Sequence, residues 1–415
     1  MKVLFLSQIV PYPPHGGVLQ RGYHIVRELG RRATVHLLAF VHPDELPTPE
    51  ALDESRRVLG QFCATVDYFP LWAKASALHT VAALGTGILS SRPFSTVAHR
   101  SPAFQRQVAA ALAGERFDVV HVDTIALHPF VDPAPDVATV LTHHNIESML
   151  LERRAQVETR AVPRWVLQRE SRKLAAYERL VAPRYDANLM MSADDARLLE
   201  RRAPGVCTAV VPNGVDIDYF APGPVSEQQP AVVYTGGMNM LANRDAVMHF
   251  TGAIWPRITA AVPEVRFFAV GQDPPAELHE AASRDPRIVV TGKVPDIRPY
   301  VRQAAVYIVP IRVGGGTRLK VLDAMASGKA LVSTSVGCEG IRVEPGTHLV
   351  VADEPVAFAD ATIALLRDPA RRAALGQAAR HLAEGEYAWS IVGDHLMTAY
   401  GRAVDRHLAS PGTRA

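Results

Sequence analysis

The chain has 415 residues, of which 48% are hydrophobic and 21% are charged, as in ordinary globular proteins. This composition excludes a disordered chain, a collagen and a coiled-coil rod, and the length favours two or three domains. Lys and Arg number 44 and Asp and Glu number 42, so the net charge is +2, a balance that does not favour a nucleic-acid binder.

The first half of the chain predicts a parallel α/β sheet, because short, continuous apolar runs alternate with helical patterns. The run that begins at Val3 stops at Ser7, and prolines follow, so it predicts a buried strand rather than a signal peptide. Strands are expected at 3–6, 33–40, 119–122, 137–142 and 187–192, and helices at 18–30 and 146–185.

Residues 75–91 are apolar and contain no Asp, Glu, Lys or Arg. A helix in the core or substrate cleft and a helix on a membrane surface both remain open for this stretch. No run of about 20 apolar residues predicts a spanning helix. Three distant cysteines form neither a disulfide framework nor a metal spacing. We therefore expect a cytoplasmic protein, with peripheral contact to the inner membrane face as an open alternative.

The second half repeats the alternation of strands and helices. Strands are expected at 209–211, 231–234, 265–270, 287–290, 306–310, 330–333 and 348–351, and helices at 243–261, 275–284, 296–304, 317–327, 355–367, 369–384 and 390–408. Two successive series predict two doubly wound, Rossmann-like domains that face a central cleft, where the carboxyl ends of the strands bind ligands. We expect an N-terminal domain at 1–205, a second domain at 206–385, and a C-terminal helix at 386–415 that returns to the N-terminal domain.

The strongest candidate site is the sequence Gly-Gly-Gly-Thr-Arg-Leu-Lys at 314–320, between a predicted strand and a predicted helix. Glycines allow close backbone approach, and a helix N-terminus with Arg318 and Lys320 suits a diphosphate. The motif lacks the ending of a Walker A loop. A flexible loop is the alternative, in which Lys320 and Asp323 form a surface pair.

Two further glycine pairs, Gly16-Gly17 and Gly236-Gly237, also follow predicted strands, where a ligand or merely a tight turn is expected. His143 and His144 end another strand and are candidates for substrate contact or proton transfer. A zinc site needs three or four convergent ligands, and His121, Asp123 and His128 could form one only by chance, so no metal is expected. No G-x-S-x-G elbow and no G-x-G-x-x-G motif occurs, which disfavours a serine hydrolase and a dinucleotide oxidoreductase.

Taken together, these motifs resemble the retaining glycosyltransferases of family 4, which have the two-domain GT-B fold. The resemblance covers nearly the whole chain and is strongest over 209–345. It is carried by Val-Pro-Asn-Gly-Val-Asp at 211–216, Tyr-Thr-Gly-Gly-Met at 234–238, Thr-Gly-Lys-Val at 291–294, the segment 314–328, Gly16-Gly17 and His144-Asn145.

The resemblance implies a metal-independent transfer of a sugar from a nucleotide-sugar, either a UDP- or a GDP-sugar, to an unidentified sugar, lipid or small-molecule acceptor. The domain at 206–385 would bind this donor. His144 would be the catalytic residue beside the donor sugar. The implied donor contacts are Gly237, Gly316, Thr317, Arg318 and Lys320 at the diphosphate, Asp323 at the ribose, and Lys293 and Val294 at the nucleobase. Gly16 and Gly17 would line the N-terminal side of the cleft.

Three positions depart from the family pattern. The first acid of the family's E-x7-E motif falls at Gly315, the second is Asp323 instead of Glu, and Met238 stands where many relatives have Arg. The donor sugar therefore stays open. A GT-B-type nucleotide-sugar epimerase and a non-catalytic nucleotide-sugar binding protein are the alternative functions.

Overall fold

The computed structural model describes residues 1–74, 76–132, 136–223 and 230–409. Residue 75 of the apolar stretch and residues 410–415 of the expected C-terminal segment lie outside them. The chain forms two compact units. The first contains Met1–Pro212 and the segment that begins at Val392, and the second contains Asn213–Ile391.

The first unit is built on a seven-stranded, all-parallel sheet with the order β3-β2-β1-β4-β5-β6-β7. Its strands are β1 (Lys2–Ser7), β2 (Thr34–Val41), β3 (Thr65–Pro70), β4 (Val119–Val122), β5 (Ala138–His143), β6 (Ala187–Met190) and β7 (Thr208–Val210). Its helices are α1 (Gly17–Gly30), α2 (Pro49–Leu59), α3 (Ala77–Leu89), α4 (Phe94–Ala98), α5 (Pro102–Gly114), α6 (Glu147–Val157), α7 (Ala161–Val181), α8 (Ala193–Arg202) and most of α16 (Trp389–Ala409).

The second unit is built on a six-stranded, all-parallel sheet with the order β10-β9-β8-β11-β12-β13. Its strands are β8 (Ala231–Thr235), β9 (Arg266–Val270), β10 (Ile288–Gly292), β11 (Val306–Val309), β12 (Ala330–Ser333) and β13 (Val350–Val351). Its helices are α9 (Leu241–His249), α10 (Trp255–Ala261), α11 (Ala276–Arg284), α12 (Arg298–Gln303), α13 (Leu319–Ala326), α14 (Pro355–Arg367) and α15 (Pro369–Leu382).

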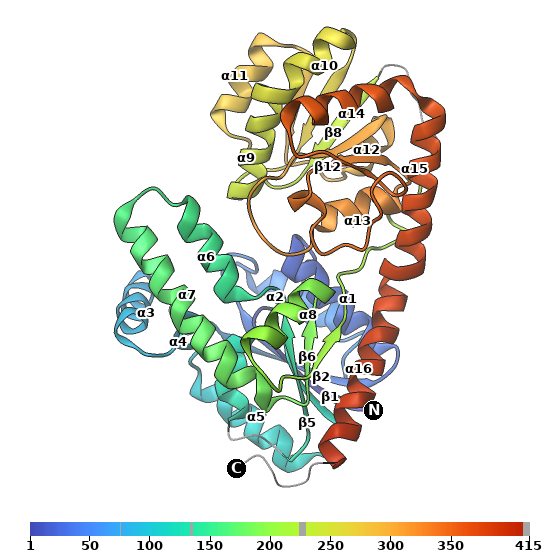
Figure 1. Ribbon diagram of the computed structural model, residues 1–415. Helices are drawn as coiled ribbons and strands as arrows, with labels where there is room; N and C mark the ends of the chain where they lie inside the picture. The colour runs from blue at the N-terminus through green and yellow to red at the C-terminus, as the bar shows by residue number, and fades with distance from the viewer. Residues whose placement is uncertain (75, 133–135, 224–229, 410–415) are drawn as a thin grey trace. The chain divides into compact units, whose positions relative to one another are not determined.

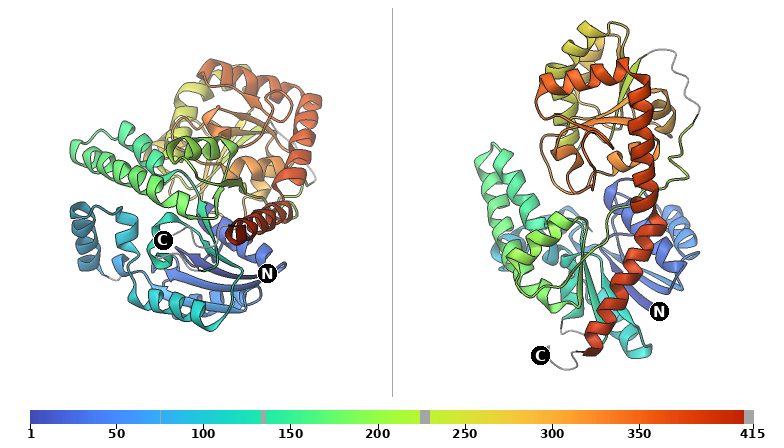
Figure 2. Two further views of the ribbon diagram at one scale, coloured as in Figure 1. Left: turned by 60° about the horizontal axis from the view of Figure 1, so that its bottom comes forward. Right: turned by 45° about the vertical axis from the view of Figure 1, so that its right-hand side comes forward.

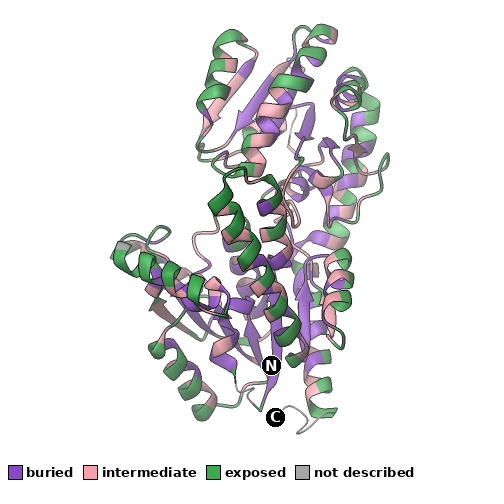
Figure 3. Cartoon of the chain, turned by 60° about the vertical axis from the view of Figure 1, so that its left-hand side comes forward, coloured by how far each residue is buried: buried purple, intermediate pink, exposed green. Residues whose placement is uncertain are grey.

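Helices cover both faces of each sheet (Figures 1 and 2), and this explains why the strands are continuous apolar runs. Every residue of β4, β5, β6 and β11 is buried. The strands are therefore coloured as buried over most of their length in Figure 3, whereas the helices carry the exposed faces. The expected α/β class with two doubly wound, Rossmann-like units is confirmed.

The C-terminal helix returns to the first unit, as expected from the sequence. From Val392 onward, α16 belongs to that unit. Tyr400 is fully buried, and its hydroxyl lies 2.5 Å from Nδ1 of His121 on β4. Near the start of the helix, the carboxylate of Asp394 accepts hydrogen bonds from the guanidinium of Arg32 at 3.0 and 3.1 Å. These long-range contacts fix α16 on the sheet.

Three local predictions were wrong. The strand expected to open the second half at 209–211 is β7, which instead pairs with β6 at the edge of the first sheet. Strand β3, at the opposite edge, was missed because its residues are mostly half-buried and form no continuous apolar run. The single helix expected at 146–185 is divided into α6 and α7 around Glu158, whose carboxylate binds the guanidinium and the backbone N–H of Arg160.

Within the described residues, no helix combines the length and the apolarity needed to cross a bilayer.

Candidate functional site

The glycine motifs of the second unit meet at one edge of its sheet. Strands β8 and β11 are parallel neighbours, so the loops after their carboxyl ends lie together. The loop after β8 contains Gly236-Gly237, and the loop after β11 leads through 314–318 into α13. The sequence prediction that these loops could share a ligand therefore has a structural basis.

The ammonium group of Lys320 is held at this edge by two hydrogen bonds and an aromatic ring. This group donates hydrogen bonds to the Tyr234 hydroxyl at 2.7 Å and to Oδ1 of Asn243 at 2.8 Å. The same nitrogen lies 4.0 Å from the centre of the Tyr234 ring, within the range of a cation–π contact. Because an ammonium group has three N–H donors, these two acceptors leave one for a ligand. Lys320 is thus held in place and is not a surface partner of Asp323.

Asn243 connects Lys320 to the glycine loop. Its Oδ1 also accepts from the Tyr234 hydroxyl at 2.7 Å, and its Nδ2 donates to the carbonyl of Gly237 at 2.7 Å. One amide therefore fixes a strand-end tyrosine, a helix lysine and the backbone of the β8 loop. Asn243 carried no sequence signal, because its partners lie 6 to 77 residues away.

Gly236 must be glycine for two reasons. Its φ is +146°, and a Cβ built on it would lie 2.5 Å from Nζ of Lys320. A side chain here would be strained by the backbone conformation and would displace the ammonium group. The close approach of the loop to Lys320 therefore depends on the missing side chain.

Arg318 lies immediately before α13, and its Nη1 donates to the carbonyl of Gly315 at 2.7 Å. Gly314 and Gly316 have φ values of +123° and +79°, so the loop turns sharply before the helix. The hydroxyl oxygen of Thr317 is buried and accepts or donates no hydrogen bond among the described residues. The loop thus places a guanidinium, a buried hydroxyl and the N-terminus of α13 at one point.

The surroundings of Lys320 disfavour its charged form when no ligand is bound. Burial, and next the positive charge of Arg318, lower the pKa of Lys320 well below its ordinary value, while Asp323 raises it. An anion placed here would favour the charged ammonium and reverse this effect. The arrangement is therefore suited to receive negative charge.

Asp323 lies one turn into α13. Burial raises the pKa of its carboxyl to about 7, and Lys320 lowers it. Its Oδ1 is buried and has no hydrogen-bond partner among the described residues, although such atoms are normally satisfied. An acceptor left open in this way suits a ligand that donates hydrogen bonds, such as a sugar hydroxyl.

The remaining positions expected to contact the donor also follow the carboxyl ends of strands in this sheet. Gly237 follows Gly236, and its carbonyl is the acceptor for Asn243. Lys293 and Val294 follow β10, two strands away from β8. Lys293 is exposed, whereas Val294 is half-buried against the core of the unit.

In the first unit, His144 lies just beyond β5. Its Nε2 is 3.2 Å from Oδ1 of Asp123, which directly follows the neighbouring strand β4. Asp123 is 4% exposed, and its backbone N–H donates to the carbonyl of Leu6 on β1 at 3.0 Å. Carboxylate oxygens accept hydrogen bonds, so this contact favours the His144 tautomer that carries a proton on Nε2.

His143 points away from His144, as alternation along a strand requires. Its Nε2 lies 2.9 Å from Oδ1 of Asn188 on β6. Burial lowers the pKa of His143 to about 4, and it lowers the pKa of His121 on β4 to about 3. Both histidines are therefore neutral packing residues near pH 7.

A second carboxylate, Glu147, begins α6 near His144. The Thr124 hydroxyl donates to its Oε1 at 3.0 Å, and burial raises the pKa of this glutamate. Asp123 and Glu147 both lie near His144, because adjacent parallel strands bring positions 123 and 144 together.

Gly16 and Gly17 lie at the start of α1, after the loop that follows β1. Gly16 is the N-cap with a φ of +91°. The next turn of α1 carries Arg21, which was missed in the sequence. It is 3% exposed and donates to the carbonyls of Val211 and Pro212 at 2.9 and 2.7 Å. Arg21 thus holds the backbone at Val211 and Pro212, where the segment Met1–Pro212 of the first unit ends.

No group of three or more His, Cys, Asp or Glu side chains is arranged to hold a metal ion in the part of the chain that the structure describes. His121, Asp123 and His128 do not form such a group. His128 instead contacts the Tyr185 hydroxyl at 3.1 Å.

Two family models match the chain in succession. Residues 15–219 match the model described as "Glycosyltransferase Family 4", and residues 229–368 match the one described as "Glycosyl transferases group 1". Together these matches cover most of both units.

Curated relatives match over about three quarters of their length. The phosphatidyl-myo-inositol mannosyltransferase of Mycolicibacterium smegmatis is 25% identical over 313 residues, which cover 72% of this chain and 75% of the relative. Its counterpart in Mycobacterium tuberculosis is 27% identical over 312 residues, covering 72% and 77%.

Solved structures share the fold over nearly the full length. The sucrose-phosphate synthase of Thermosynechococcus elongatus has a TM-score of 0.69 at 18% identity and covers 99% of this chain and 100% of its own. HepE of Anabaena, solved in complex with UDP, has a TM-score of 0.66 at 15% identity, with 96% and 99% covered.

Proposed function

Because the chain belongs to the family 4 glycosyltransferases and has their GT-B fold, we propose that it is a retaining hexosyltransferase that needs no metal. The donor is a nucleoside diphosphate sugar, and the acceptor is a hydroxyl group. The observation that carries the proposal is the half-buried Lys320, which is fixed by Tyr234 and Asn243 at the N-terminus of α13, beside Arg318.

The second unit binds the donor. Arg318, Lys320 and the free N–H groups of α13 bind the diphosphate, because charge-assisted hydrogen bonds to phosphate are strong and directional. Gly237, Gly316 and Thr317 complete the diphosphate site. The open acceptor of Asp323 binds the ribose hydroxyls, and the nucleobase lies near Lys293 and Val294.

The reaction breaks the bond between the anomeric carbon and the diphosphate oxygen, and the electron pair leaves with the diphosphate. Preorganised cations stabilise this growing charge without reorganisation, which replaces the role of a divalent metal. The acceptor oxygen forms the new bond on the same face of the sugar, and its proton passes to a phosphate oxygen. This path retains the anomeric configuration.

The first unit binds the acceptor side, with Gly16 and Gly17 lining it. His144 contacts the donor sugar and stabilises charge in the transition state. Asp123 is a positioning residue, since it fixes the ring and the tautomer of His144. Asp123→Asn is expected to lower kcat while leaving the KM for the donor nearly unchanged, because an amide can also donate to the ring and so allows the other tautomer. A purely structural role would change kcat and KM together.

The relatives named for transfer to phosphatidyl-myo-inositol support an acceptor that is carried by a lipid. We therefore propose peripheral contact with the inner face of the membrane. Another relative is named for GDP-mannose, whereas HepE was solved with UDP. The donor is therefore either a GDP-sugar or a UDP-sugar, and the experiment below includes both.

The deciding experiment incubates the purified protein with UDP- and GDP-sugars, with and without a lipid extract, after extensive dialysis against EDTA. Mass spectrometry is expected to show a glycosylated acceptor and a free nucleoside diphosphate, and NMR coupling constants are expected to show the donor's anomeric configuration in the product. Inversion, or activity that returns only with magnesium or manganese, would contradict the mechanism. An epimerised donor without acceptor would identify an epimerase, and binding without turnover a binding protein.

A further inference from the structure

Helix α3 has an apolar face that is exposed to solvent. Leu78 is 81% exposed, Val81 66%, and Leu89 88%. Residues 77–89 contain no Asp, Glu, Lys or Arg. A single exposed leucine needs no explanation, but a contiguous group does.

The spacing of these side chains places them on one side of the helix. Leu78, Val81, Leu84 and Ile88 recur at intervals of three and four residues, so they form one stripe. The opposite side packs inward, where Ala83 is fully buried and a Cβ on Gly87 would lie 2.8 Å from the ring of Phe94. The helix is thus apolar on its solvent side as well as on its packed side.

Helix α7 extends this surface with positive charge. Arg169 Nη2 donates to the carbonyl of Ile88 at 2.9 Å, and Lys173 Nζ donates to that of Gly87 at 2.8 Å. These contacts bring one face of α7 to the C-terminal end of α3. The same face carries Trp165, which is 54% exposed, and Arg172.

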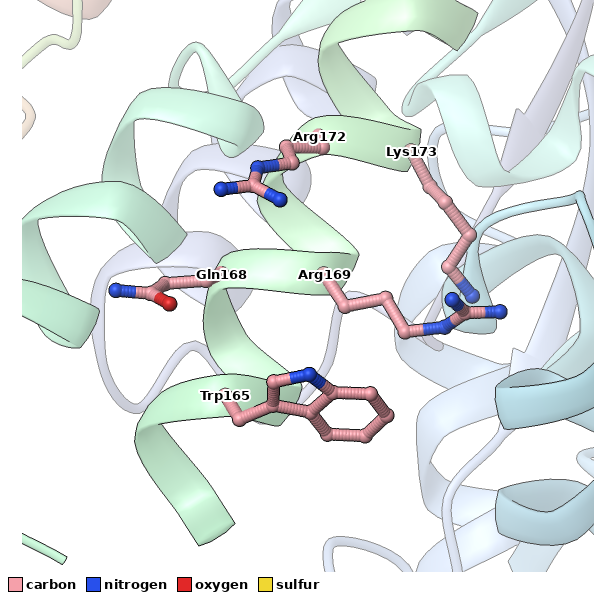
Figure 4. A pocket seen from close by; sticks show the side chains of 5 residues that line it. All are labelled: Trp165, Gln168, Arg169, Arg172 and Lys173. Carbon is pink, nitrogen blue, oxygen red and sulfur yellow. The ribbon is translucent and has the colours of Figure 1, made fainter. Parts of the chain in front are cut away.

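The basic residues border a surface hollow of about 220 Å³ lined by Trp165, Gln168, Arg169, Arg172 and Lys173. Figure 4 shows that Arg169 and Lys173 extend to the same side of α7, above the indole ring. Among the described residues, the ion pair of this face joins Lys173 to Glu170, and none involves Arg169 or Arg172. The net charge of this face is therefore positive.

We propose that the α3–α7 surface, defined by the apolar stripe of α3 and the Trp165–Lys173 face of α7, docks onto a bilayer of anionic lipids. The apolar side chains enter the acyl boundary, the indole lies at the headgroup level, and the arginines contact lipid phosphates. This combination of an uncharged apolar stripe with arginines that form no ion pair distinguishes a lipid surface from a second copy of the chain, whose arginines would repel each other. The proposal rests on the proposed lipid-carried acceptor and names the surface that reaches it.

The test is sedimentation of the full chain with phosphatidylcholine vesicles, with and without 30% phosphatidylglycerol. Binding is expected only to the anionic vesicles and is expected to weaken with salt. Arg172→Gln should lower the partition coefficient about fivefold, the usual effect of one basic residue near an anionic surface. Leu78→Ser with Leu89→Ser should lower it at least about tenfold, because apolar burial is lost.

Matched controls come from α16, which takes no part in this surface. Arg402→Gln and Leu408→Ser change exposed residues of the same types and should bind like the wild type. Trp165 fluorescence should shift to the blue with anionic vesicles, and Trp165→Phe should remove that shift. Equal binding of the α3 and α16 variants would overturn the proposal. So would binding that ignores lipid charge, or a dimer that Leu78→Ser dissociates.

Calorimetry with UDP and GDP separates this inference from the proposed function. A protein that binds a nucleotide but no vesicle retains the function and refutes the docking surface. A protein that binds vesicles through α3 and α7 but neither nucleotide supports the docking surface and refutes the function.

Discussion

Asp323→Asn is expected to stabilise the ligand-free protein above pH 7, since it removes a charge whose burial is unfavourable. The pKa of the folded carboxyl is raised from its ordinary value of 3.8 to about 7. The folded state therefore keeps its proton where the unfolded chain has lost it, and stability falls as the pH rises from about 4 to 7. At 1.36 kcal/mol per pKa unit, the ionised carboxylate costs the folded state at most about 4 kcal/mol at pH 8.

The magnitude can be checked by urea unfolding of the wild type and the variant at pH 5.5 and pH 8. At pH 5.5 the ionised carboxylate destabilises the folded state by only about 2 kcal/mol. The difference in unfolding free energy between the variant and the wild type should therefore grow by about 2 kcal/mol from pH 5.5 to pH 8. Asp405→Asn, an exposed position on α16, is the matched control and should show no such growth.

The same substitution should weaken binding of the nucleoside diphosphate about tenfold, because a carboxylate is the stronger acceptor for ribose hydroxyls. Stability and binding would then change in opposite directions, as is common where a site is strained for function. A variant that is less stable at both pH values, or whose advantage does not depend on pH, would refute the assignment of Asp323 as a buried, unsatisfied acceptor.

Three further outcomes are expected. Lys320→Met should weaken diphosphate binding at least about tenfold, a loss typical of a charge-assisted hydrogen bond. In the wild type the affinity for the diphosphate should fall as the pH rises through the lowered pKa of Lys320, because the ammonium group loses its charge. Calorimetry across pH 6–10 measures this fall. A constant affinity would show that the ammonium group does not bind the diphosphate. Gly236→Ala should weaken donor binding by displacing Nζ of Lys320, whereas Gly205→Ala, at another positive φ with open space, should affect stability alone. His144→Ala should leave nucleoside diphosphate affinity unchanged and lower the transfer rate by one to three orders of magnitude, roughly the effect of a positioned polar group. His143→Ala should mainly lower the melting temperature, and equal effects of the two histidines on rate would show that the wrong one was assigned.

Much of the fold and the glycine loop at 314–318 could be predicted from local sequence. Buried parallel strands are continuous apolar runs, so most strands of both sheets could be predicted from the sequence pattern, whereas β3, which has no such run, was missed. The glycines and cations at 314–320 lie together in sequence, and their order fixes a loop followed by a helix N-terminus. His144 was proposed as a site residue because it follows a strand, where α/β sheets bind ligands.

The tertiary structure decided which side chains cooperate. Lys320 meets Tyr234 and Asn243 across 77 to 86 residues, and Asp123 meets His144 only because β4 and β5 are paired. The exposure of the α3 stripe likewise could not be inferred, since an apolar helix has the same sequence in a core or on a surface. Local patterns report the preferences of neighbouring residues, whereas strand order and packing set which distant groups share a dielectric environment and a hydrogen bond.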